Sequence, residues 1–218
     1  MLRPGWTDAV LCTALLALSV SALTACTTLG GGSASPVAGA ATAATRESPS
    51  PELQARYASL LNRLQAGDTG AATELAAFST ENPELAGPLL NLGLARGRAG
   101  DEVGARALFE RASAVCSHCG PVWNELGVLD RLQGRFAEAE KAYRRAIELE
   151  PGYAPAYYNL AVLYELYIPR PDLALENYER YLQMGGTDGA GQDVEKWAGD
   201  LRRRVGATTD SVRAEETS

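Results

Sequence analysis

Residues 120–153 read GPVWNELGVLDRLQGRFAEAEKAYRRAIELEPGY, and this stretch decides the fold. The chain repeats it in both directions at a constant interval. Gly127 has a counterpart at Gly93, 34 residues earlier, and another small residue at Ala161, 34 residues later. A fixed period of this size indicates supersecondary units that stack on their neighbours.

Within the stretch, the spacing of apolar residues predicts two helices joined by a tight turn. Ala139, Tyr143 and Ala146 recur at intervals of three and four, which places them on one face of a helix. Gly134 suits the left-handed end of a preceding helix. Pro151 ends the second helix, because proline lacks the N–H group that a helix interior needs.

The period and the placed residues resemble the tetratricopeptide repeat (TPR) family. The residues that carry the resemblance are Trp123, Leu126, Gly127, Ala139, Tyr143, Ala146 and Pro151. Small residues lie where the two helices cross closely, and large ones fill the space beside them. The resemblance implies an all-α fold, a TPR-type α-solenoid.

The array extends on both sides of the central unit. We expect a TPR domain over 52–205 made of a degenerate repeat (52–85), three clear repeats (86–119, 120–153 and 154–188) and a capping helix (193–205). End repeats need a cap with a polar outer face. In the last repeat, prolines at 169 and 171 lengthen the turn between the helices. The polar residues 206–218 are expected to be a disordered tail.

Residues 1–25 are typical of a secretory signal, because Arg3 precedes an uncharged apolar run that is too short for a spanning helix. The sequence LTAC that ends at Cys26 resembles the bacterial lipobox. This implies cleavage after Ala25 and a covalent lipid on Cys26, while an ordinary signal peptide or signal anchor is the alternative. Residues 26–51 would comprise the lipidated cysteine and a flexible linker. Thr27, by resemblance to Gram-negative sorting, favours the outer membrane, facing the periplasm.

Composition excludes several function classes. The chain has 218 residues and a formal net charge of −7, which argues against nucleic acid as a partner. The single histidine, His118, leaves almost nothing for a Ser-His-Asp triad or a His-rich metal site. We therefore expect no enzyme activity, no metal and no cofactor apart from the lipid.

The one cluster of reactive residue types is the loop Cys116-Ser-His-Cys119, between the first two clear repeats. An exported domain meets an oxidising compartment, which favours a disulfide. Idle thiols, a redox-active pair and a metal site that includes His118 stay open as alternatives. The last two would make the chain a thiol redox or metal-handling envelope protein.

In TPR proteins the first helix of each unit lines an inner groove. Carried over to this chain, the groove residues are Leu90, Asn91, Leu94, Arg98, Asn124, Glu125, Val128, Arg131, Tyr158, Asn159, Val162 and Glu165. Asparagine amides can both donate to and accept from an extended peptide backbone. The alternative is that several of these residues are solvated or lie between helices.

The resemblance implies a membrane-tethered adaptor or scaffold that binds a peptide or protein partner in the bacterial envelope, held there by the lipid anchor. Relatives with this layout act in pilus and secretin assembly, in recruiting cell-wall enzymes and beside energised outer-membrane transport systems. The sequence does not choose among these processes. A structural spacer, with no partner in the groove, is a further alternative.

Overall fold

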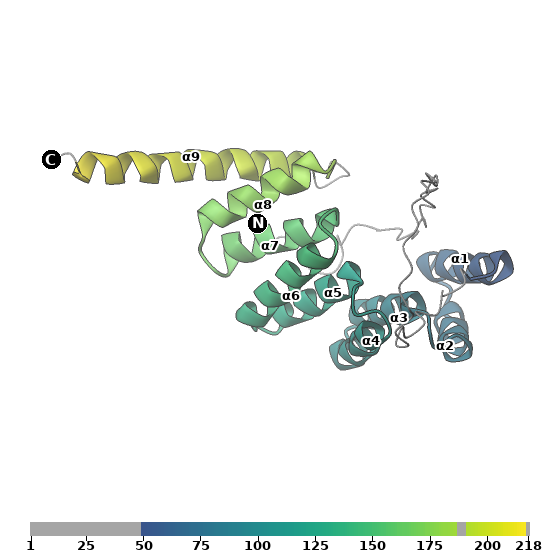
Figure 1. The fold of residues 1–218 in the computed structure, drawn as a ribbon. Helices are drawn as coiled ribbons and strands as arrows, with labels where there is room; N and C mark the ends of the chain where they lie inside the picture. Colours follow the sequence, from purple (N-terminus) through teal and green to yellow (C-terminus); the bar gives the residue numbers. More distant parts are fainter. Residues whose placement is uncertain (1–48, 187–190, 217–218) are drawn as a thin grey trace, which may run out of the picture.

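The computed structural model describes residues 49–186 and 191–216, and every regular element in these ranges is an α-helix (Figure 1). The helices are α1 (Pro51–Gln65), α2 (Ala71–Glu81), α3 (Ala86–Arg98), α4 (Glu102–Val115), α5 (Gly120–Leu132), α6 (Phe136–Leu149), α7 (Ala154–Leu166), α8 (Pro171–Gln183) and α9 (Gly191–Glu216). The predicted signal segment, Cys26 and most of the predicted linker lie outside the described residues. Within them, no helix is both long enough and apolar enough to cross a bilayer.

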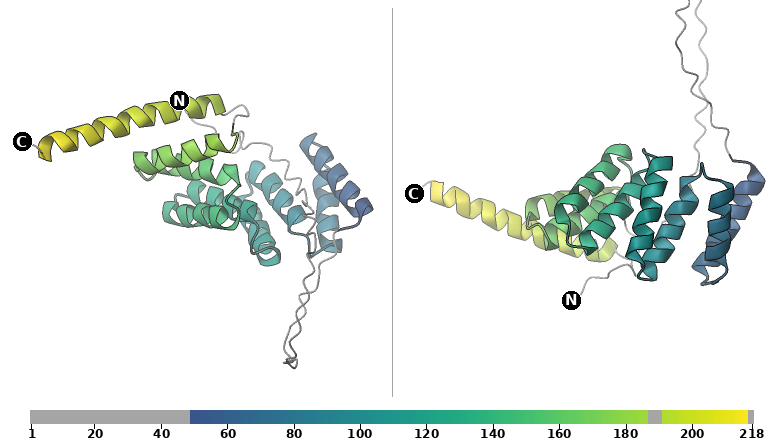
Figure 2. Two further views of the ribbon diagram at one scale, coloured as in Figure 1. Left: turned by 45° about the horizontal axis from the view of Figure 1, so that its top comes forward. Right: turned by 90° about the horizontal axis from the view of Figure 1, so that it is seen from below.

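The helices stack in pairs, and each pair packs on the next. The pairs α3–α4, α5–α6 and α7–α8 form the closest contacts, while α4–α5 and α6–α7 join one pair to its neighbour. The helices α1 and α2 precede them, and α9 packs on α8 at the other end (Figures 1 and 2). The expected all-α, TPR-type architecture is therefore confirmed for the described residues.

The signature glycines let the two helices of a pair approach each other closely. A Cβ atom added at Gly127 in α5 would lie 2.7 Å from Cε1 of Tyr143 in α6, closer than real Cβ contacts allow. Gly93 in α3 faces the ring of Phe109 in α4 in the same way. Both rings are fully buried. The small residue and the large aromatic are therefore two halves of one contact.

The turns within the repeats differ in chemistry. In the first two clear repeats, Gly100 (φ 82°) and Gly134 (φ 73°) adopt the left-handed conformation that ends a helix. The third repeat has no glycine there. Instead, the amide of Arg170 donates to the carbonyl of Tyr164 at 3.0 Å, and Pro171 opens α8. The proline-rich turn is thus closed by a backbone hydrogen bond that spans the extra residue.

An ionic cluster ties the first clear repeat to the second. Asp130 in α5 is almost buried, and its Oδ1 accepts hydrogen bonds at 2.6 Å from Arg106 in α4 and from Arg135 at the start of α6. A nearly buried carboxylate is costly unless it is paired, and here two guanidinium groups satisfy it. The bond to Arg106 fixes how one pair sits on the next.

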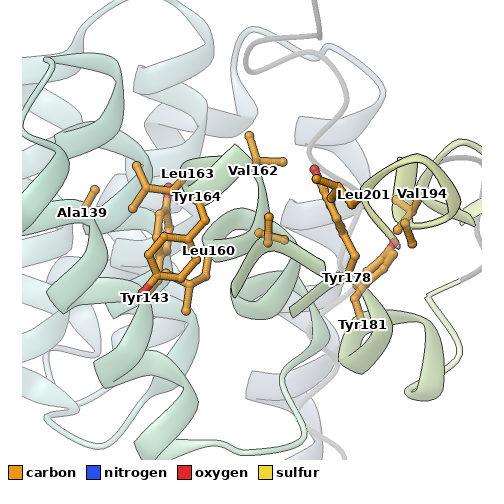
Figure 3. Close-up of a cluster of buried hydrophobic side chains, with 13 residues drawn as sticks. Ala139, Tyr143, Leu160, Val162, Leu163, Tyr164, Tyr178, Tyr181, Val194 and Leu201 are labelled. Carbon is orange, nitrogen blue, oxygen red and sulfur yellow. The ribbon is translucent and has the colours of Figure 1, made fainter. Parts of the chain in front are cut away.

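The hydrophobic core runs along the whole stack. Leu60, Leu75 and Phe78 bury the predicted degenerate repeat against α3. At the other end, one cluster joins the last two repeats to α9. Figure 3 shows Tyr178 and Tyr181 of α8 directed toward Val194 and Leu201 of α9.

The last helix is longer than the sequence pattern indicates. We expected a capping helix over 193–205 and a disordered tail after it, but α9 continues to Glu216. Val194, Ala198 and Leu201 are buried against α8, which anchors the first half. No proline follows Val205 in the chain, and Gly206 alone does not break the i to i−4 hydrogen bonding. The second half therefore projects beyond α8, as Figure 1 shows.

The layer of first helices as a candidate binding site

The first helices of successive repeats are linked by side-chain hydrogen bonds. Nδ2 of Asn159 in α7 donates to Oδ1 of Asn124 in α5 at 2.9 Å. Nδ2 of Asn91 in α3 donates to the hydroxyl of Tyr57 in α1 at 2.7 Å. The helices α5 and α7 also touch directly. We refer to α3, α5 and α7 as the inner layer.

The predicted asparagines serve this layer from within. Asn124 is only 2% exposed, and its amide also donates to Oε1 of Glu125 at 2.9 Å. Asn91 donates a second hydrogen bond to the carbonyl of Gly87 at 3.0 Å. These amides hold helices together, so the structure places them between helices and not in an open groove. That was the alternative which the sequence left open.

The predicted apolar groove residues also contribute to the packing. Val162 is buried in the core cluster of the last repeats. Leu90, Leu94, Val128 and Tyr158 are half-buried and pack against the clusters beneath them. The ring centroid of Tyr158 lies 5.4 Å from that of Tyr181. One side of these residues therefore supports the fold, while the other stays accessible to solvent.

Charged residues gather at the centre of the layer. Burial raises the pKa of Glu125 to about 7, against the opposing effects of its hydrogen bond from Asn124 and the positive charges of Arg98 and Arg131. Arg131 is itself held in place: its Nε donates to the hydroxyl of Tyr143 at 3.3 Å, and its guanidinium lies 5.8 Å from the ring centroid of Tyr167. The last predicted charge, Glu165, accepts a hydrogen bond from the Tyr178 hydroxyl at 2.8 Å.

The sequence prediction missed the most exposed apolar residues near the layer. Leu132 and Leu166, the last residues of α5 and α7, are 38% and 47% exposed, and Tyr167 is 39% exposed. Arg98, the last residue of α3, occupies the equivalent position one repeat earlier and is also exposed. We call Arg98, Leu132, Leu166 and Tyr167 the turn-side row. The 34-residue period would have found the first three of them.

The cysteine loop contains a disulfide between Cys116 and Cys119. It joins the residue that ends α4 to the residue that precedes α5. The amide of Cys119 donates to the carbonyl of Cys116 at 3.3 Å, as Tyr153 does to Glu150 at the next junction, at 2.9 Å. The same backbone turn thus forms once with a disulfide and once without. The described part of the chain holds no group of three or more His, Cys, Asp or Glu side chains suited to a metal ion.

Comparisons with known proteins agree with this architecture. Residues 127–166 match the family model of the TPR repeat. Among solved structures, PilF of Pseudomonas aeruginosa is 22% identical with a TM-score of 0.61, and the match covers 74% of this chain and 72% of PilF. No curated protein matches the chain significantly by sequence.

Two further solved structures show the same fold. A TPR protein of Thermus thermophilus is 23% identical, with a TM-score of 0.57, over 68% of this chain and 80% of that protein. YrrB, described as a TPR protein with an unusual peptide-binding site, is 18% identical, with a TM-score of 0.55, over 65% of this chain and 71% of its own. At these identities the likeness establishes the paired-helix fold.

Proposed function

We propose that this protein is a TPR adaptor that binds a peptide or protein partner along its inner layer and performs no chemistry of its own. The observation that carries the proposal is the pairing of a preorganised layer with exposed apolar side chains. Leu132 and Leu166 recur at one repeat position and stay in solvent. Exposed apolar groups that gather on one part of a surface mark interaction sites.

The internal hydrogen bonds support this proposal. Because Asn124 and Asn159 fix α5 against α7, the layer needs little ordering when a partner binds. Binding that avoids such ordering keeps more of its contact energy as affinity. The likeness to YrrB, a protein with a peptide-binding site, is consistent with a similar use of the fold here.

We further propose that lipid on Cys26 tethers the adaptor to a bacterial envelope, on the periplasmic side of the outer membrane. The lipobox-like LTAC sequence supports this, and so does the disulfide between Cys116 and Cys119. Disulfides form and persist mainly in oxidising compartments outside the cytosol. Assembly of pili or secretins, recruitment of cell-wall enzymes and energised transport are all processes that such an adaptor would serve.

Site-specific photocrosslinking tests partner binding. A benzophenone amino acid placed at Leu94, half-buried in the inner layer, should give a discrete adduct in intact cells. The matched control is Lys141, which is exposed on α6, a helix outside the layer. Adducts at Leu94 but not at Lys141 are the expected result. An equal pattern at both positions, or no adduct at either, would reject the adaptor.

Mass spectrometry of the mature amino terminus tests the tether. We expect the chain to begin at Cys26 with acyl groups attached, and we expect Cys26→Ser to move the protein from the membrane to the soluble fraction. An unacylated amino terminus on a membrane-free protein would remove this half of the proposal and leave the adaptor intact.

A further inference from the structure

We infer that the turn-side row (Arg98, Leu132, Leu166 and Tyr167) receives a partner segment in which a carboxylate is followed by two large apolar side chains. This inference rests on the proposed adaptor function, since it names the chemistry of the partner. The row lies beside the predicted groove residues, at the end of the inner layer where the turns within the repeats begin.

The row is a regular feature of the repeat. Arg98, Leu132 and Leu166 are each the final residue of a first helix, and each is 34 residues from the next. Equivalent positions in stacked repeats form a line across the stack. The line therefore presents one cation and then two leucines, and Tyr167 extends it by one residue.

The apolar part of the row is rigidly supported. The ring of Tyr167 packs on Phe136, with 4.9 Å between the centroids, and its other contact is the guanidinium of Arg131. The Phe136–Tyr167 contact also links the two repeats that contribute Leu132 and Leu166. A side chain that is fixed by its neighbours and still exposed loses little entropy on binding, which is what a contact residue requires.

The charge of the row is unbalanced. Arg98 has no ion pair or hydrogen bond among residues 49–186 and 191–216, although its field reaches Glu125. Other arginines near the turns are neutralised, in the pairs Arg96–Asp101, Arg135–Asp130 and Arg170–Asp172. In a chain with a net charge of −7, a cation left without an acidic partner is a natural contact for a carboxylate.

The repeat geometry sets the spacing in the partner. Packed helices such as α5 and α7 lie roughly 8–10 Å apart. An extended chain rises about 3.3 Å per residue, so it advances by one repeat in about three residues. The partner segment should therefore carry an acidic residue and two large apolar residues at three-residue intervals. An extended peptide is the occupant that matches this spacing.

Labelled synthetic peptides test the inference on the full chain. The probe is a capped Ser/Gly peptide with Glu, Leu and Leu at three-residue intervals, and binding is followed by fluorescence anisotropy. One comparator peptide replaces Glu with Lys, and another replaces both Leu residues with Ser. We expect the probe to bind at least about tenfold more tightly than either comparator, because each comparator removes one complementary contact.

Variants of the protein locate the binding. L132S/L166S should weaken probe binding at least about tenfold, and R98E should reverse the preference between the Glu and Lys peptides. Val103→Ser is the matched control, since Val103 is 82% exposed but is not part of the row. Circular dichroism should show unchanged helix content in all variants, because every substituted side chain is exposed.

Several results would overturn the inference. Equal binding of all three peptides would do so, as would unchanged binding in L132S/L166S. Binding to phosphatidylglycerol vesicles that L132S/L166S abolishes, without a peptide preference, would assign the row to a lipid surface. A dimer in light scattering that the same variant dissolves would assign it to a second copy. If crosslinking from Leu94 still succeeds in these cases, only the partner chemistry is wrong.

Discussion

The side-chain amide of Asn159 donates a 2.9 Å hydrogen bond to the side-chain oxygen of Asn124, 35 residues earlier in the chain. The bond connects the first helices of two successive repeats, and the donor's partner is almost completely buried. Residues of this kind would serve well in a peptide clasp. In this protein they hold the scaffold to which a partner would bind.

Asn124→Ala should therefore reduce stability before it affects binding. The change leaves the amide of Asn159 without its acceptor, and an unsatisfied polar group costs about 1–3 kcal/mol. Urea denaturation should show a loss of that size. The double variant N124A/N159A should lose less than the sum of the two single losses, because both partners are then gone. Full stability with abolished partner capture would instead assign these amides to the clasp.

Gly127→Ala should destabilise the second clear repeat. The added methyl group would lie 2.7 Å from Cε1 of the fully buried Tyr143, so the helices must separate or the ring must move. Overpacking of this kind costs about 1–3 kcal/mol. Gly199→Ala in α9 is the matched control, since its nearest non-local atom would be 4.0 Å away. Alanine should stabilise that helix by about 0.5–1 kcal/mol. Thermal unfolding of both variants measures the difference.

Stability should fall between pH 4.5 and pH 7 through Glu125. Burial raises the pKa of this carboxyl from 4.5 to about 7, so the folded chain holds a proton that the unfolded chain has lost. The stabilising contribution is complete below pH 4.5 and is lost as the pH rises through 7, with a size on the order of 2 kcal/mol.

Glu125→Gln should remove that part of the pH dependence, because glutamine does not titrate. Urea unfolding at pH 5 and at pH 8 gives the difference for each protein. Glu138→Gln, a change at an exposed position of α6, should leave the profile of the natural chain unaltered. A steep profile that persists in the Glu125 variant would show that another group is responsible.

C116S/C119S should lower stability by about 2 kcal/mol, since the four-residue loop loses its covalent closure. The fold should persist, because the Glu150–Tyr153 turn has the same backbone hydrogen bond without a disulfide. Unfolding with and without dithiothreitol measures this, and the variant should not respond to the reductant. An adaptor should still capture its partner. Loss of function in a folded variant would favour a thiol-based role.

Periodicity predicted the helices of the clear repeats, because the local pattern of small, aromatic and proline residues suffices to define a helix–turn–helix unit. It failed at α9, which runs to Glu216 although the sequence after Val205 is polar. The structure anchors that helix through Val194, Ala198 and Leu201, and the backbone then propagates beyond the anchored part. Propagation is easier than nucleation, and apolar spacing does not record it.

The chain's own order of residues determines that paired helices stack in a line, because each unit has an apolar face that only a neighbouring unit can cover. The exposure of individual side chains depends on how the units pack. Asn124 and Leu132 lie on the same helix, yet one is buried in a bond to Asn159 while the other is left in solvent. The angle and spacing between adjacent helices separate these two fates, and those quantities exist only in the assembled stack.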